Sequence, residues 1–249
     1  MKLKLLSSGK ANTKLGKNGI DKIDIYSLNL RPYKTIIDGK SFNVCPFANS
    51  CAKNCVGDNG HFGMKNGSAY KAQLRKTEQY FRDPKQFYKD LYNDITVANN
   101  KAKKKGNKLV LRLNAYSDIN HYKQSLRYMK KDIYSTFNDV IFYDYSKDYK
   151  KAINNDILNY SVSFSYDEVT TDKQFFEIVN AGKSISVVFE KLPKTYKGIK
   201  VTNGDLDDNR FLDEKNTVTG LKFKGSKAKL FQAIANGFCI PSLSNQLTY

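Results

Sequence analysis

The stretch Lys108-Leu-Val-Leu-Arg-Leu113, followed at once by the polar Asn114-Ala-Tyr-Ser-Asp118, decides the fold class. A short apolar run that ends in turn-forming residues is typical of a buried strand. The pattern recurs, because Val140–Tyr143 precedes Asp144-Tyr-Ser-Lys147 and Tyr160–Phe164 precedes Ser165-Tyr-Asp-Glu168. Two further runs of strand composition are Ile185–Phe189 and Val218–Phe223.

Segments with helical periodicity separate these runs. One helix is expected over Tyr70–Phe81 and a second from Asp83-Pro84, where Asp supplies an N-cap and Pro fits the first turn. A third follows Asn120, its apolar positions continuing to Phe137, and a last one covers Ser226–Asn236. The alternation predicts an α/β fold, with a mainly parallel sheet or a partial (β/α) barrel. We expect one domain over residues 1–249, in which 40–67 is a cysteine-rich, cluster-binding loop and 68–239 the α/β body.

The polar residues at the strand ends are candidate site groups. Loops at the carboxyl ends of parallel strands share one edge of the sheet, where active sites are assembled. Such residues also turn chains and cap helices, so each has a purely structural alternative. The candidate catalytic residues are Asn114, Asp118, Asp144, Lys147 and Glu168.

Three of the four cysteines lie within eleven residues, in Cys45-Pro-Phe-Ala-Asn-Ser-Cys51-Ala-Lys-Asn-Cys55. The apolar run after Met1 is too short for a secretory signal, so we expect reduced thiols. Clustered thiolates among small and polar residues are typical of an iron–sulfur site. The prediction is a 4Fe-4S cluster bound by Cys45, Cys51, Cys55 and the distant Cys239.

Zinc is the main alternative, because Cys45, Cys51 and Cys55 with His61 give a Cys3His set. Free buried thiols are a third, and Cys239 in its apolar surroundings also fits a small core residue. The two histidines, His61 and His121, are ligand or acid–base candidates, although an isolated histidine beside an aromatic residue is more often structural.

The formal net charge is +18, from 42 Lys and Arg against 24 Asp and Glu. So basic a chain attracts polyanions, and nucleic acid is the first partner to expect. Solvated helix faces are the structural alternative. Residues 99–106 look like an exposed basic turn after a helix. The candidate nucleic-acid-binding residues are Lys101, Lys103, Lys104, Lys105, Lys150, Lys151 and Arg210.

Four carboxylates gather in Asn203-Gly-Asp-Leu-Asp-Asp-Asn-Arg-Phe-Leu-Asp213. Their spacing does not match a calcium loop, so we favour a segment that fixes Arg210 over a cation site. No run of eighteen apolar residues occurs, and no membrane-spanning segment is expected.

Several ordered motifs resemble the "gene product 88" domain family of phages and plasmids. They include the cysteine motif at 45–55, Leu-Arg-Leu-Asn-x-x-Ser-Asp at 111–118, Phe-Tyr-Asp-Tyr-Ser-Lys at 142–147 and Gly-Leu-Lys-Phe-Lys-Gly at 220–225. The likeness covers about residues 40 to 239. It implies a mobile-element protein of the bacterial cytoplasm and leaves the chemistry open.

A weaker, architectural resemblance links the chain to radical S-adenosylmethionine enzymes, whose cluster lies above a partial barrel. Their usual C-x3-C-x2-C spacing is replaced here by C-x5-C-x3-C. If Cys239 binds the fourth iron, no iron stays open for the cofactor. Three functions follow: a cluster protein that binds and acts on nucleic acid, which we favour; a radical enzyme with an open iron; and a zinc-stabilised protein that binds a host factor.

Overall fold

The computed structural model describes residues 3–9, 22–58 and 62–242. Its largest element is a sheet of nine strands in the order β1-β2-β5-β6-β7-β8-β11-β10-β9. The strands are β1 (Leu6–Ser8), β2 (Ile23–Leu28), β5 (Lys108–Arg112), β6 (Ile141–Ser146), β7 (Tyr160–Ser165), β8 (Ser184–Phe189), β9 (Thr195–Tyr196), β10 (Ile199–Asn203) and β11 (Val218–Lys222). Neighbouring strands are parallel except at the two edges, where β1 and β9 run antiparallel.

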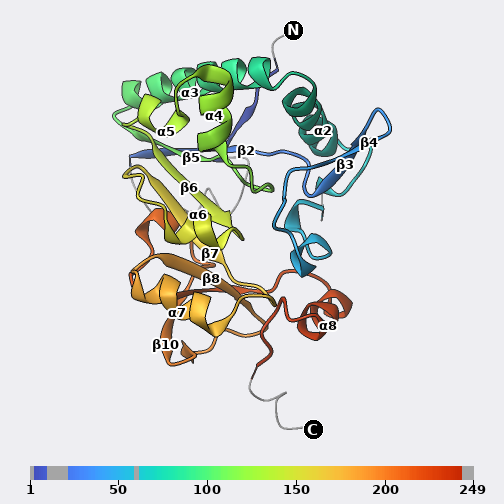
Figure 1. Ribbon diagram of the computed structural model, residues 1–249, viewed down its shortest axis with the longest axis vertical. Coiled ribbons are helices and arrows are strands. Elements are labelled where there is room, and N and C mark those ends of the chain that lie inside the picture. The colour runs from blue at the N-terminus through green and yellow to red at the C-terminus, as the bar shows by residue number, and fades with distance from the viewer. Residues whose placement is uncertain (1–2, 10–21, 59–61, 243–249) are drawn as a thin grey trace.

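Seven helices and a hairpin accompany this sheet in the described residues. The helices are α2 (Ser68–Arg82), α3 (Pro84–Lys104), α4 (His121–Met129), α5 (Ile133–Thr136), α6 (Tyr149–Ile153), α7 (Asp172–Asn180) and α8 (Lys227–Ala235). The hairpin of β3 (Lys34–Ile37) and β4 (Lys40–Asn43) projects from the body beside α2 (Figure 1). The predicted α/β class with a mostly parallel sheet is therefore confirmed.

Strands β2, β5, β6, β7, β8 and β11 adjoin one another in their order along the chain. Right-handed crossovers that always advance in one direction place their helices on one face of a sheet. One continuous core accordingly joins the strands to α3, α5, α6 and α7, with Phe87, Phe142 and Phe175 fully buried within it. The described strands do not close into a barrel.

The opposite face of the sheet carries a smaller core. Tyr143 packs there with Ile25 and Val110, whereas its neighbour Phe142 belongs to the main core, as the period of two along a strand requires. Phe211, from the short 3-10 helix η5 (Arg210–Leu212), covers this second cluster. The acidic segment around residues 203–213 therefore lies against this second face of the sheet, opposite the main core.

Three local predictions were wrong. The third helix ends at Met129 and restarts at Ile133 as α5, because Lys130 adopts the left-handed conformation (φ 63°). Residues 99–104 are the last turns of α3 instead of an exposed turn. Within the expected loop, residues 40–43 form β4, and η2 (Ser50–Ala52) and η3 (Val56–Asp58) are 3-10 turns.

Candidate metal centre and adjoining cavity

The cysteine segment lies beside the loops that leave the carboxyl ends of the parallel strands (Figure 1). The backbone N–H of Asp118 donates to the Val44 carbonyl at 2.8 Å. The Cys45 thiol donates to the Tyr116 carbonyl at 3.4 Å. The loop after β5 is thereby fixed against the first cysteine.

Acidic residues after β7 hold the second cysteine's turn. The Asn49 amide donates to Asp167 at 2.9 Å, and the Ser50 backbone N–H donates to Glu168 at 2.8 Å. Ser50 begins η2, which contains Cys51. Glu168, a candidate catalytic residue, thus positions the cysteine turn by accepting its hydrogen bonds.

Arg31 fixes the turn that follows the third cysteine. Its guanidinium donates to the Gly57 carbonyl at 3.2 Å, to the Phe62 carbonyl at 2.9 Å and to Gln73 of α2 at 3.0 Å. A Cβ on Gly57 would lie 2.8 Å from the Tyr116 ring, so this turn packs closely only with glycine. The cysteine segment is consequently tied to the sheet on one side and to α2 on the other.

Cys45, Cys51 and Cys55 line one cavity of about 220 Å³. Burial raises the pKa of the Cys45 thiol to about 12, and also raises the pKa of Cys51 and of Cys55. Two cations act the other way, since Lys147 lowers the pKa of Cys51 and Arg31 that of Cys55. Without a bound cation these thiols stay protonated at neutral pH, and a metal would displace the protons.

Cys239 is not brought into this cavity. Its side chain is 1% exposed, and its backbone N–H donates to the Ala233 carbonyl of α8 at 3.0 Å. The preceding residue, Phe238, lines the cavity with the three other cysteines. The expected fourth ligand therefore packs as a small core residue next to the site.

Within residues 3–9, 22–58 and 62–242, no three His, Cys, Asp or Glu side chains converge closely enough to hold a single metal ion. Tetrahedral zinc, with Zn–S bonds of about 2.3 Å, would require its sulfurs to lie about 4 Å apart. A cubane cluster spaces its thiolates more widely, because each binds a different iron. His61, the fourth ligand of the zinc alternative, lies outside the described residues.

Of the strand-end candidates, Asn114, Asp118 and Lys147 line the cysteine cavity, whereas Asp144 and Glu168 are not among its lining residues. Asp144 is buried and accepts hydrogen bonds from the Asn114 backbone at 2.6 Å and from Tyr160 at 3.1 Å. Burial raises the pKa of Asp144. Asp144 of β6 therefore links the loop after β5 to β7 through hydrogen bonds.

A second cavity, of about 350 Å³, shares Arg112, Tyr116, Tyr145 and Phe238 with the first, so the two adjoin. Arg112 donates to Asp208 at 2.8 Å, and the Tyr145 hydroxyl donates to the same carboxylate at 3.0 Å. Burial by itself lowers the pKa of Arg112, but the charges of Asp208 and its neighbours raise it above the ordinary value.

Sequence reasoning missed Arg112 and Asp208 as residues of this site. The available signal was the single charge inside the apolar run 109–113. An arginine within a buried strand needs a partner, and the acidic segment 203–213 supplies it.

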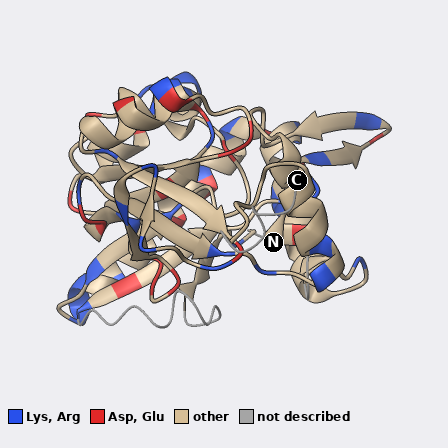
Figure 2. Cartoon of the chain, turned by 90° about the horizontal axis from the view of Figure 1, so that it is seen from below, with Lys and Arg blue, Asp and Glu red and all other residues tan. Residues whose placement is uncertain are grey.

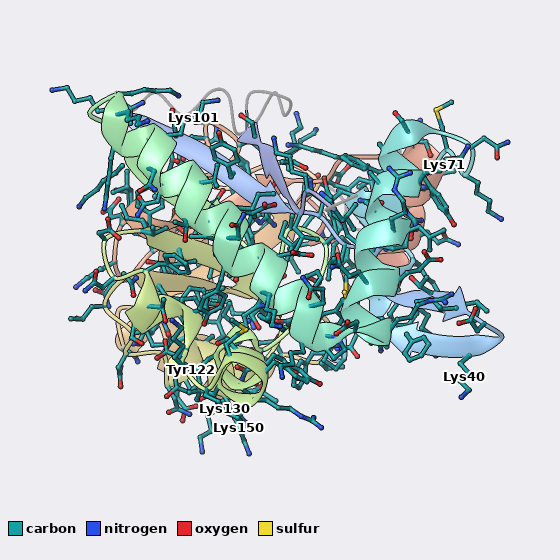
Figure 3. All side chains as sticks on the ribbon, turned by 90° about the horizontal axis from the view of Figure 1, so that it is seen from above. Lys40, Lys71, Lys101, Tyr122, Lys130 and Lys150 are labelled. Atoms are coloured by element: carbon teal, nitrogen blue, oxygen red, sulfur yellow. The ribbon has the colours of Figure 1, made fainter. Side chains whose placement is uncertain are left out.

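The basic candidates are dispersed, and Figure 2 shows Lys and Arg on several sides of the molecule with acidic residues among them. Lys103 pairs with Asp139, Lys105 with Asp24 and Lys151 with Asp118. Figure 3 shows Lys101 at the end of α3, far from Lys150 on α6; Lys104 is also exposed on α3.

Arg210 lies in the interior instead of on the expected nucleic-acid-binding surface. It is 4% exposed and pairs with Asp207 and with Asp213. The prediction that the acidic segment fixes this arginine is confirmed by these ion pairs.

A family model described as Gene product 88 matches residues 4–242 of the chain. Neither a curated protein nor a solved structure matches the sequence. None of the helices in the described part of the chain is long and apolar enough to cross a membrane.

Proposed function

We propose that this chain, which belongs to the Gene product 88 family, is an iron–sulfur enzyme. In this proposal Cys45, Cys51 and Cys55 hold a 4Fe-4S cluster. Its fourth iron has no cysteine ligand and faces the second cavity. The observation that carries this proposal is that three cysteines line one cavity at the carboxyl ends of parallel strands, whereas Cys239 is buried and does not line it.

The residues around the thiols fit such a cluster. Lys147 and Arg31 offset the negative charge of the thiolates, and backbone hydrogen bonds of Tyr33, Asn49 and Gly57 lower the pKa values of the three cysteines. Charge and hydrogen bonds to sulfur are the protein's means of tuning a cluster. The cavity is also lined by the aromatic rings of Phe47, Tyr116 and Phe238.

The architecture resembles that of the radical S-adenosylmethionine enzymes, so an open iron would be the place for a sulfonium cofactor. Such a cluster, once reduced by an external donor, would supply one electron to the sulfonium, and one C–S bond would break to give a thioether and a carbon radical. Asn114 and Lys147 lie in the same cavity and would orient the cofactor's polar groups. The cavity at Arg112 would hold the substrate, because it adjoins the cysteines without including them.

Two other assignments remain as alternatives with different metal contents. A cluster closed by Cys239 has no open iron and serves as a structural or redox centre. Zinc held by the three cysteines and His61 would give the cysteine segment a purely structural role. That role fits a protein that binds a host factor.

The decisive test measures iron, sulfide and zinc in protein purified without oxygen, for the wild type, Cys51→Ser and Cys239→Ser. We expect about four irons per chain, the number in a cubane, in the wild type and in Cys239→Ser. Cys51→Ser should lose most of the iron. Addition of S-adenosylmethionine to the reduced wild-type protein should change its electron paramagnetic resonance spectrum, because the cofactor binds the open iron.

Loss of iron from a Cys239→Ser protein that retains its far-UV circular dichroism would contradict the proposal that one iron has no cysteine ligand. Stoichiometric zinc without iron in the wild type would overturn the cluster itself. An unchanged iron content in Cys51→Ser would remove that cysteine from the ligand set.

A further inference from the structure

A concentrated basic segment borders the second cavity. Lys222, Lys224, Lys227 and Lys229 occur within eight residues at the end of β11 and the start of α8, and residues 222–231 contain no acid. The side chains of Lys222, Lys224 and Lys227 are exposed, and that of Lys229 is half-buried. Lys222 and Lys224 also line the cavity. We call residues 222–231 the basic rim.

Aromatic rings accompany these lysines. Phe223 lines the cavity, and Phe231 of α8 is 60% exposed. Lys227 Nζ lies 6.0 Å from the centroid of the Phe231 ring. Lysines beside exposed rings are what single-stranded nucleic acid needs, since phosphates pair with the cations and bases stack on the rings.

The basic rim is held in place by the sheet. The Lys222 backbone N–H donates to Asp205 at 2.7 Å, and the Phe223 backbone N–H donates to the Phe189 carbonyl of β8 at 2.8 Å. Lys224 pairs with Asp205 at 3.0 Å, yet its side chain is 57% exposed. Lysines on a backbone that is already ordered beside a cavity lose less conformational entropy on binding than lysines on a mobile tail.

We infer that the basic rim binds the phosphates of single-stranded nucleic acid and directs one nucleotide into the cavity beside the cysteines. Polynucleotide is then the substrate class of the enzyme. That second part rests on the proposed function, whereas strand binding by the rim stands independently of any metal.

The basic rim differs from the other basic surfaces in its position. Lys85, Lys89, Lys101 and Lys104 on α3 are also exposed, but none of them lines either of the two cavities. They provide a matched control, because replacing all four changes the net charge by the same amount as replacing the four lysines of the rim.

The test compares a rim variant (Lys222, Lys224, Lys227 and Lys229 each to Gln) with the α3 variant (Lys85, Lys89, Lys101 and Lys104 each to Gln). Fluorescence anisotropy would follow binding of labelled 20-nucleotide DNA and RNA strands between 50 and 200 mM salt. We expect the rim variant to bind at least about tenfold more weakly, and its slope of log K against log salt to shrink by about 3. The α3 variant should bind within about threefold of the wild type.

Phe231→Ala separates stacking from charge. It should weaken binding by about tenfold while leaving the salt slope unchanged, because a ring releases no counterions. Preference for the DNA or the RNA strand identifies the type of substrate.

Equal weakening in the rim and α3 variants would overturn the inference, because it would mean diffuse attraction to the whole molecule. Absence of wild-type binding to either strand would overturn it as well. Strand binding by Cys51→Ser protein that lacks iron would leave the rim's role intact even if the cluster proposal fails. Iron content in the rim variant should equal that of the wild type.

Discussion

At the scale of single residues, burial and partners decide which polar side chains are available for chemistry. His121 illustrates the point, because it follows a strand-end loop and its residue type makes it a ligand or acid–base candidate. It is 1% exposed, and its Nδ1 lies 2.9 Å from the Tyr88 hydroxyl. Burial and the nearby charge of Lys151 lower the pKa of His121 to about 3, so its ring is neutral in the folded protein.

This depressed pKa predicts a pH-dependent loss of stability. An unfolded histidine titrates near 6.5, so below that pH the unfolded state takes up a proton that the folded state refuses. The free energy of unfolding should fall between pH 6.5 and pH 5 by about 2 kcal/mol from this residue. His121→Gln should flatten that part of the stability–pH curve, as measured by urea unfolding. A slope identical to the wild type would contradict the neutral, buried histidine.

At the scale of elements, caps and turns decide where helices stop. Asn120 accepts from the Lys123 backbone N–H at 3.0 Å and begins α4. Asp132 accepts from the Ser135 backbone N–H at 2.8 Å and begins α5. Met129 before the break and Ile133 and Phe137 after it all pack in or against the main core, so their spacing continues across the break, whereas Tyr122 and Leu126 of α4 are exposed. A periodic pattern alone therefore missed the break.

Lys130, the residue between α4 and α5, has a side chain that disfavours the backbone conformation it adopts there. Lys130 has φ 63°, a region that costs a residue with a Cβ roughly 1–2 kcal/mol. Lys130→Gly should raise the free energy of unfolding by about 1 kcal/mol. The same substitution at Lys123, inside α4, should lower it by about 1 kcal/mol. Denaturant unfolding of the two variants should show shifts of opposite sign, and a loss of stability in Lys130→Gly would refute the assigned turn.

At the scale of the whole molecule, one ion pair joins the acidic segment to the sheet. Arg112 of β5 and Asp208 meet at 2.8 Å, although 96 residues separate them along the chain. Tyr143 and Tyr145 of β6 also donate to Asp208, at 3.1 and 3.0 Å. Arg112, Tyr145 and Asp208 of this network line the second cavity.

Neutralising Asp208 should lower the stability of the protein, because the buried Arg112 would keep its charge without an opposite charge beside it. Asp208→Asn should lower the free energy of unfolding by about 3 kcal/mol. Glu214→Gln is the matched control: its partner Lys200 is 63% exposed, and an exposed pair contributes at most about 1 kcal/mol. Equal losses in the two variants, measured by urea unfolding, would show that the network is not a buried ion pair.

The fold class, the strand runs and the caps of α3 and α8 follow from the amino-acid sequence alone, since periodicity and capping are local properties of the chain. The sequence also singles out the three neighbouring cysteines. The predicted helices do not include α7, although Thr171 and Gln174 form a capping box at its start.

The availability of charges and thiols depends on the tertiary structure. That structure separated Cys239 from the other cysteines, buried Arg210 among carboxylates, and joined Arg112 to Asp208. It also paired Lys103, Lys105 and Lys151 with acids that lie 33 or more residues away in the sequence. Contacts between distant segments depend on strand order and helix packing, so composition and local spacing do not contain them.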